Sequence, residues 1–439
     1  MAFFSSTDKA LWRLALPMIF SNITVPLLGL VDTAVIGHLD SAAYLGGVAV
    51  GAMATSFLFM LLLFLRMSTT GLTAQAYGAK NPVALAQALV QPLLLALIAG
   101  FAIFALRGPL IDLALHITGG SEEVLVQARR FLEIRWLSAP ASLANLVLLG
   151  WLLGVQYARA PVILLVVGNL LNIVLDLWLV MGLDMNVQGA ALSTVIAEYV
   201  TFVIGLMMAW KVLRLRGVSI EMLKTAWRGN IRALLALNRD IMLRSLLLQL
   251  CFGSITVLGA RLGGEIVAVN AVLMTLLTFT AYALDGFAYA VEAHSGHAFG
   301  ARDRSSLLNV WRAACRQAGI VALAFALVYA CFGNSIVAML TSIEALRQLA
   351  GHYLPWQILL PLVGVWCYLL DGMFIGATRG RDMRNSMAVA ALGFGVTLLL
   401  LPVLGNHGLW LALCVFLALR GLTLGWMWRR YWRNDRWFT

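Results

Sequence analysis

Four polar side chains in otherwise apolar stretches could together bind and release a proton or a small cation. Asp32 stands alone in an apolar stretch, Asn172 and Asp176 lie four residues apart on one face of a helix, and Thr194 follows in the next apolar run. A carboxylate inside a membrane costs at least ~2.5–3.5 kcal/mol on insertion scales, so it is a functional candidate by default. Two carboxylates close together in a low dielectric favour protonation of one of them. The same oxygens could equally bind Na⁺, and the bland alternative is a hydrogen-bonded structural pair.

The elements that must position these residues are membrane-spanning helices. The chain has 439 residues, of which 62% are hydrophobic and 12% charged, and its mean hydropathy is +0.89. Soluble proteins carry about 25% charged residues. Apolar runs of about 20 residues predict an all-α polytopic membrane protein with twelve transmembrane helices. The predicted spans are 11–37, 42–65, 84–106, 134–156, 161–180, 187–210, 241–262, 266–290, 314–333, 353–377, 386–404 and 407–428.

The basic residues predict the orientation. Most of the 31 Lys and Arg fall in loops on one side of these spans, and basic loops face the cytoplasm, so we expect both termini there. The fifth predicted helix then runs outward from Pro161 and places Asp176 about 22 Å from its inner end. Asp32 and Thr194 reach a similar depth on their helices. The four polar residues are therefore expected at one level in the outer half of the membrane.

The two halves of the chain repeat each other at a shift of 222 residues. The segment 77–80 (Tyr-Gly-Ala-Lys) matches 299–302 (Phe-Gly-Ala-Arg) at this shift. Six spans per half predict two six-helix bundles related by a pseudo-two-fold axis along the membrane normal. We expect an N-terminal lobe over 1–210, a basic linker on the inner membrane surface over 211–240, and a C-terminal lobe over 241–439. Substrate sites of such transporters lie between the repeats, although duplicated bundles also serve channels and structural proteins.

The second half carries its own intramembrane acids. Asp285 and Asp371 are candidates for lining a substrate cavity, whereas Glu292 could instead reach the inner interface. Met53 and Met274 could line an adaptable drug cavity, but core packing is the simpler explanation.

Several function classes are excluded by pattern. The five cysteines show no paired spacing and no neighbouring His cluster, which predicts neither a disulfide framework nor a metal site. The sequence contains no nucleophile motif and no phosphate-binding Gly loop, so we expect neither an enzyme, an ATP-driven pump nor a cofactor. The basic charge is scattered over short loops, which argues against nucleic acid as a partner. An ion gradient is the remaining energy source.

The chain resembles the multidrug and toxic compound extrusion (MATE) family, especially its bacterial DNA-damage-inducible protein F (DinF) branch. The resemblance rests on six plus six helices, the duplicated segment and the Val31-Asp32-Thr33 motif. It implies a V-shaped pair of lobes that exports cationic or amphipathic drugs in exchange for H⁺ or Na⁺. Asp32, Asn172, Asp176 and Thr194 then match the family's N-lobe cation site, and protonation of Asp32 would bend the first helix at its hinge, Pro17.

One departure from the family pattern favours protons. Some members place an acid in the seventh helix, but residues 247–262 contain none. We therefore expect H⁺ coupling through the N-lobe alone, in a monomeric multi-pass protein of the bacterial inner membrane. A Na⁺-coupled exporter and a lipid-linked precursor flippase of the wider superfamily remain the alternatives.

Overall fold

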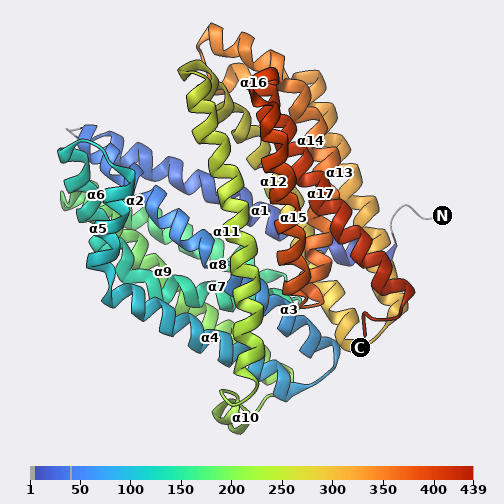
Figure 1. Ribbon diagram of the computed structural model, residues 1–439. Helices are drawn as coiled ribbons and strands as arrows, with labels where there is room; N and C mark the ends of the chain where they lie inside the picture. Colours follow the sequence, from blue (N-terminus) through green and yellow to red (C-terminus); the bar gives the residue numbers. More distant parts are fainter. Residues whose placement is uncertain (1–4, 40–41, 439) are drawn as a thin grey trace. The chain divides into compact units, whose positions relative to one another are not determined.

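The computed structural model describes residues 5–39 and 42–438, with the backbone alone over 25–33. All regular secondary structure in this part of the chain is helical (Figure 1). The helices of the first half are α1 (Ser6–Gly37), α2 (Ala42–Leu61), α3 (Phe64–Gly78), α4 (Pro82–Ala105), α5 (Arg107–Thr118), α6 (Glu122–Arg135), η1 (Trp136–Ser138), α7 (Ala139–Gly154), α8 (Arg159–Asp176), η2 (Leu177–Gly182) and α9 (Asn186–Leu215). They are followed by α10 (Ile220–Thr225), α11 (Ile231–Leu262), α12 (Gly264–Ala301), α13 (Arg304–Leu340), α14 (Glu344–Gly376), α15 (Gly380–Thr397), η3 (Leu398–Leu400), α16 (Leu401–Leu404) and α17 (Asn406–Arg433).

The helices confirm the predicted all-α membrane protein. Eleven helical segments of the described residues are long and apolar enough to cross a membrane. Helix α1 corresponds to the first predicted span, 11–37, and brings the number to twelve. The second span differs from its prediction of 42–65, because α2 and α3 together run from Ala42 to Gly78. The polar stretch of α3 disguised this extension. Its buried Thr69 and Thr70 hydroxyls donate to backbone carbonyls one turn earlier, so they satisfy themselves inside the helix.

The repeat is visible in the backbone of the turns. Lys80 and Arg302 lie 222 residues apart, and both adopt the left-handed conformation, with φ of 52° and 54°. Gln156 and Thr378 form a second pair at the same shift, with φ of 63° and 56°. Non-glycine residues rarely adopt positive φ, so two matched pairs indicate that the halves share their turn geometry.

The same shift relates two helix caps. The Asn81 side chain accepts a hydrogen bond from the Ala84 amide at 3.2 Å and caps α4. The Asp303 side chain accepts one from the Ser306 amide at 3.1 Å and caps α13. The Ser306 hydroxyl also donates to the Asp303 carboxylate. The hydrogen bond from this hydroxyl, and to a smaller extent the one from the Ser306 amide, lower the pKa of the Asp303 carboxyl below its ordinary value. The two caps have the same geometry but only one of them carries a charge.

The chain forms two compact units whose boundaries fall at Asn22 and Leu235. One unit holds Met1–Asn22 and Ala236–Thr439, and the other holds Ile23–Leu235. Helix α1 therefore contributes its first half to the unit built from the second half of the chain.

Packing explains why the start of α1 belongs there. The Trp12 ring lies edge-on to Phe287 with centroids 4.8 Å apart, and its indole N–H donates to Gln317 at 3.0 Å. Farther along, the Asn22 side chain donates to the Tyr282 carbonyl at 3.2 Å. These contacts anchor the first half of α1 to α12 and α13.

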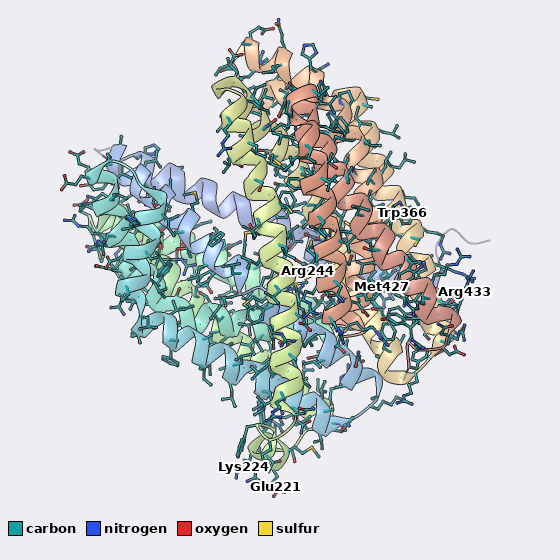
Figure 2. The ribbon with its side chains drawn as sticks, viewed as in Figure 1. Glu221, Lys224, Arg244, Trp366, Met427 and Arg433 are labelled. Atoms are coloured by element: carbon teal, nitrogen blue, oxygen red, sulfur yellow. The ribbon has the colours of Figure 1, made fainter. Side chains whose placement is uncertain are left out.

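The basic segment between the halves is partly helical. Helix α10 carries Glu221 and Lys224, labelled in Figure 2. The turn that follows α10 is tied to α4, because the Gln91 side chain donates to the carbonyls of Ala226 and Arg228 at 3.2 and 3.1 Å. The basic segment therefore packs on α4 and forms the C-terminal part of the unit Ile23–Leu235.

Candidate functional site

Helix α8 positions two of the predicted site residues on its buried face. Asn172 and Asp176 are 2% and 0% exposed. The opposite face of α8 is apolar and open, with Leu170 and Val174 59% and 60% exposed. Polar inside and apolar outside is the arrangement that a helix bordering lipid requires. The prediction that Asn172 and Asp176 share an inward face is consistent with this geometry.

A close approach of α9 brings its hydroxyls to these residues. A Cβ on Gly189 would lie 3.1 Å from the carbonyl carbon and oxygen of Leu179 in η2, so only glycine fits there without displacing the backbone. Directly after Asp176 the chain makes the π-helical turn η2, a feature often found at functional sites. The end of α8 and the start of α9 are therefore held against each other.

The polar side chains of α8 and α9 form one hydrogen-bonded cluster. The Ser193 hydroxyl contacts the Asp176 carboxylate and lies 3.2 Å from the Asn172 side-chain oxygen. The Asn172 amide donates to the Thr194 hydroxyl at 3.4 Å, and that hydroxyl in turn donates to the Ala190 carbonyl at 3.2 Å. The structure thus brings together three of the four predicted residues and adds Ser193.

The second carboxylate oxygen of Asp176 has a different environment. It is fully buried and has no hydrogen-bond partner among the described residues. No described Lys, Arg or His forms an ion pair with Asp176 either. A buried, unpaired carboxylate is costly, and binding of a proton or a small hard cation would remove that cost. In the described cluster, the atoms that could coordinate such a cation are the side-chain oxygens of Asn172, Ser193 and Thr194.

The fourth predicted residue, Asp32, has its backbone in α1, and its side chain lies outside the described atoms. One turn later, Val35 and Ile36 are 8% and 1% exposed and belong to the same apolar cluster as Val180 and Ala190. This cluster fixes the end of α1 against η2 and the start of α9. The backbone of Asp32 is therefore one turn from a segment that packs on the Asp176 site.

The unit built from the second half buries a carboxylate in another way. Asp371 of α14 lies between Arg244 of α11, at 2.6 Å, and Arg420 of α17; Arg244 is labelled in Figure 2. The three residues are 6%, 7% and 3% exposed. Asp285 of α12 is partly buried and interacts electrostatically with all three. Asp371 is thus paired twice, whereas Asp176 is not paired with any described cation.

The remaining predicted residues are placed as follows. Met53 is 57% exposed on α2, and Met274 is a partly buried residue that packs on the apolar core around α12 and α14. Pro17 is partly buried inside α1, five residues before Asn22, where the helix passes from one compact unit to the other.

Comparison with known proteins places this geometry in a family. A family model described as MatE matches the chain twice, over residues 17–178 and 241–403. DNA damage-inducible protein F of Escherichia coli (strain K12) is 81% identical over 438 residues, covering 100% of this chain and 95% of that protein. The chain belongs to the MatE family. Probable multidrug resistance protein NorM of Bradyrhizobium diazoefficiens, another relative, is 29% identical over 87% of this chain and 83% of its own.

A solved structure shares the fold of this MatE chain. A crystal structure of MATE in the straight conformation aligns with a TM-score of 0.85 at 20% identity, covering 99% of this chain and 98% of that one. The predicted family is confirmed, and with it the prediction of a membrane transporter in place of an enzyme. The family model matches each half separately, as the predicted duplication requires.

Three features of this MatE transporter were missed in the sequence. Ser193 precedes the predicted Thr194, and its neighbours gave no reason to prefer it. Asp371 pairs with Arg244, 127 positions away, and with Arg420, 49 positions away. No local spacing in the sequence indicates this pairing. Glu198 did carry a signal, since it is a lone carboxylate inside the apolar run 187–210, the same criterion that selected Asp32.

Proposed function

We propose that this transporter exports cationic or amphipathic small molecules in exchange for protons that bind in the N-lobe. The observation that carries the proposal is the carboxylate of Asp176, which is fully buried. Among the described residues it hydrogen-bonds only to the neutral side chain of Ser193, and one of its oxygens has no described partner. Such a group is stabilised by taking up a proton and becomes costly again when it loses one. The protonated fraction of Asp176 can therefore follow the proton gradient.

Sodium is the second candidate for the coupling ion. The carboxylate, amide and hydroxyl oxygens of Asp176, Asn172 and Thr194 are the hard donors that Na⁺ accepts. Protons are preferred because the Asn172 oxygen and the Thr194 hydroxyl are already engaged in hydrogen bonds of the cluster, whereas one oxygen of Asp176 has no described partner. A cation would have to break several of these bonds, whereas a proton on Asp176 adds a donor without breaking any of them.

Helix α1 is the element that links ion binding to substrate release in this proposal. Asp32 lies in its second half and Pro17 in its first, and the helix changes the compact unit to which it belongs after Asn22. A proline inside a helix removes one backbone hydrogen bond and permits bending. Charge neutralisation at the site is proposed to change the packing of the second half of α1 while the first half stays anchored by Trp12.

The substrate class and the location follow the relatives and the charge pattern. The NorM relative is named a probable multidrug resistance protein, which supports small amphipathic or cationic substrates, with the lipid bilayer as the other partner. We propose a monomer in the bacterial inner membrane with both termini in the cytoplasm, the side on which its basic loops gather.

Efflux of ethidium from proteoliposomes under an imposed ΔpH or ΔpNa tests this function. Asp176→Asn keeps the size of the side chain but removes the proton site, and we expect ΔpH-driven efflux to fall by at least about 100-fold. The matched control is Asp112→Asn, which removes an exposed acid of the same unit that pairs with Arg129. Efflux driven by ΔpNa but not by ΔpH would replace the proton by sodium. Undiminished ΔpH-driven efflux by Asp176→Asn would refute the coupling role.

A further inference from the structure

A second carboxylate of the same unit, Glu198, lies near the middle of α9. Glu198 is on α9, four residues after Thr194 and therefore on the same helix face about 6 Å farther along the axis. It is partly buried. The Asn145 side chain of α7 donates to its carboxylate at 2.9 Å and to its backbone carbonyl at 3.1 Å. Glu198 is thus held in one position by a neutral amide.

The groups around Glu198 leave its charge uncompensated. Helices α7 and α2 and the segments η1 and η2 carry no Asp, Glu, Lys, Arg or His. Helix α8 contributes Asp176 and, at its opposite end, Arg159. The last turn of α6 carries Glu133 and Arg135, and the Arg135 guanidinium donates to Ser138. No cationic side chain of the described residues lies within 4.0 Å of the Glu198 carboxylate.

Polar side chains of η1 and α7 lie on the side of α7 that carries Asn145. Ser138 and Ser142 are 0% and 7% exposed, and their hydroxyls lie 3.3 Å apart. Asn145 follows three residues after Ser142, which keeps it on the same face. Ser138 and Ser142 thus form a hydrogen-bonded pair, and Asn145 continues this polar face as far as Glu198.

We propose that Glu198 is a second proton-carrying residue, which receives the proton that Asp176 releases. This inference rests on the proposed function. In the transfer the O–H bond of the Asp176 carboxyl breaks and an O–H bond forms on the Glu198 carboxylate. Ser193, which contacts Asp176, lies five residues before Glu198 on α9. The negative charge moves to Asp176 as the proton moves toward the Leu215 end of α9. Asn145 is the positioning residue.

The test uses the full-length protein in proteoliposomes, with ethidium efflux and internal pH recorded together. Glu198→Gln keeps an acceptor for Asn145 and removes the proton, so we expect ΔpH-driven efflux and the accompanying proton flux to fall at least about tenfold. Ethidium binding and gradient-independent ethidium exchange should remain. Glu198→Asp should restore part of the flux. The matched control is Tyr199→Phe, which removes the hydrogen bond of the next residue to the Leu137 carbonyl and should leave coupling unchanged.

A second variant keeps the carboxylate and removes its partner. Asn145→Leu should move the pH of half-maximal efflux by on the order of one unit, because an amide bond to a charged group is lost. A uniform loss of efflux at every pH would instead show that Asn145 and Glu198 only hold α7 against α9, and would overturn the proposal.

The outcomes separate this inference from the proposed function. Wild-type efflux without proton movement would refute the function and this proposal together. Proton-driven efflux that Asp176→Asn abolishes but Glu198→Gln leaves at the wild-type rate would refute the role of Glu198 alone. If Glu198→Gln does not accumulate in the membrane, the Asn145→Leu profile decides between the two readings.

Discussion

Asp176 in the first half and Asp371 in the second are both buried carboxylates, but their surroundings are opposite in kind. Asp176 in the first half accepts a hydrogen bond from the Ser193 hydroxyl, and its other oxygen has no described partner. Asp371 in the second half is held between the guanidinium groups of Arg244 and Arg420. The repeat has therefore conserved turns and caps but not the chemistry inside the bundle. A carboxylate that lacks a fixed countercharge can exchange an ion, whereas one with two countercharges is committed to structure.

The difference agrees with the expectation of coupling through one lobe. A buried ion pair of excellent geometry keeps its charges in place, and its removal is costly mainly because it strands a charge. In the proposed function, the second half is a stable frame and the first half responds to the ion gradient. Variants of each carboxylate site should therefore fail in different assays, stability for one and coupling for the other.

The largest effect is expected from stranding a charge in the second half. Arg420→Met removes one of the two partners of Asp371 in a site where all three residues are buried. We expect a loss of about 3–5 kcal/mol in the free energy of unfolding, measured as a lower thermal midpoint in detergent. Arg261→Met, at the exposed end of α11, is the control. An unchanged midpoint for Arg420→Met would mean that the site is not structural.

Removing the whole buried triad sharpens the comparison. Arg244→Met, Asp371→Leu and Arg420→Met combined leave no charge stranded among the three, so most of the stability lost in the single variant should return. Proton-driven efflux should also return to within about tenfold of wild type, since the coupling carboxylate is untouched. A stable triple variant that has lost all efflux would show that Asp371 acts in transport and would break the contrast between the halves.

The N-lobe site should show the reverse pattern. Ser193→Ala removes the hydroxyl that contacts Asp176 and should lower ΔpH-driven efflux about tenfold, with only about 1 kcal/mol lost in stability. Thr201→Val is the control on the same helix, because that hydroxyl donates to the Ala197 carbonyl of its own turn. A large loss of stability without a change in efflux would contradict a coupling role for the site.

The smallest effect concerns the matched caps. Asn81→Ala should cost about 1 kcal/mol at any pH, and Asp303→Ala a similar amount at neutral pH. The pKa of Asp303 is lowered from its ordinary value of 3.8, so its cap stabilises the fold above that value and is lost as the pH falls through the lowered pKa. The measurement is the thermal midpoint of each variant and of wild type from pH 6 down to about 3. The midpoint of Asp303→Ala should approach that of wild type as the pH falls, whereas the midpoint of Asn81→Ala should stay lower throughout.

Much of the architecture could be predicted because bilayer and helix impose periodic signals. Long apolar runs predicted the spans, and the 222-residue shift predicted the matched turns at Lys80 and Arg302. The spacing of Asn172 and Asp176 predicted a shared face, since helical periodicity is local. The extension of the second span to Gly78 was missed because Ser and Thr of α3 look like loop residues until their hydroxyls bond inside the helix.

The amino-acid sequence by itself determined that this chain crosses the membrane repeatedly, that it is duplicated, and which residues are costly inside a bilayer. Those properties depend on composition and on neighbours within a few turns. Only the tertiary structure decided which buried carboxylate is paired, because Arg244, Asp371 and Arg420 meet through packing of three helices far apart in the chain. It also decided that Ser193 contacts Asp176 and that Asn145 holds Glu198. Partnership between helices depends on which faces meet, and residue spacing along one helix does not encode that choice.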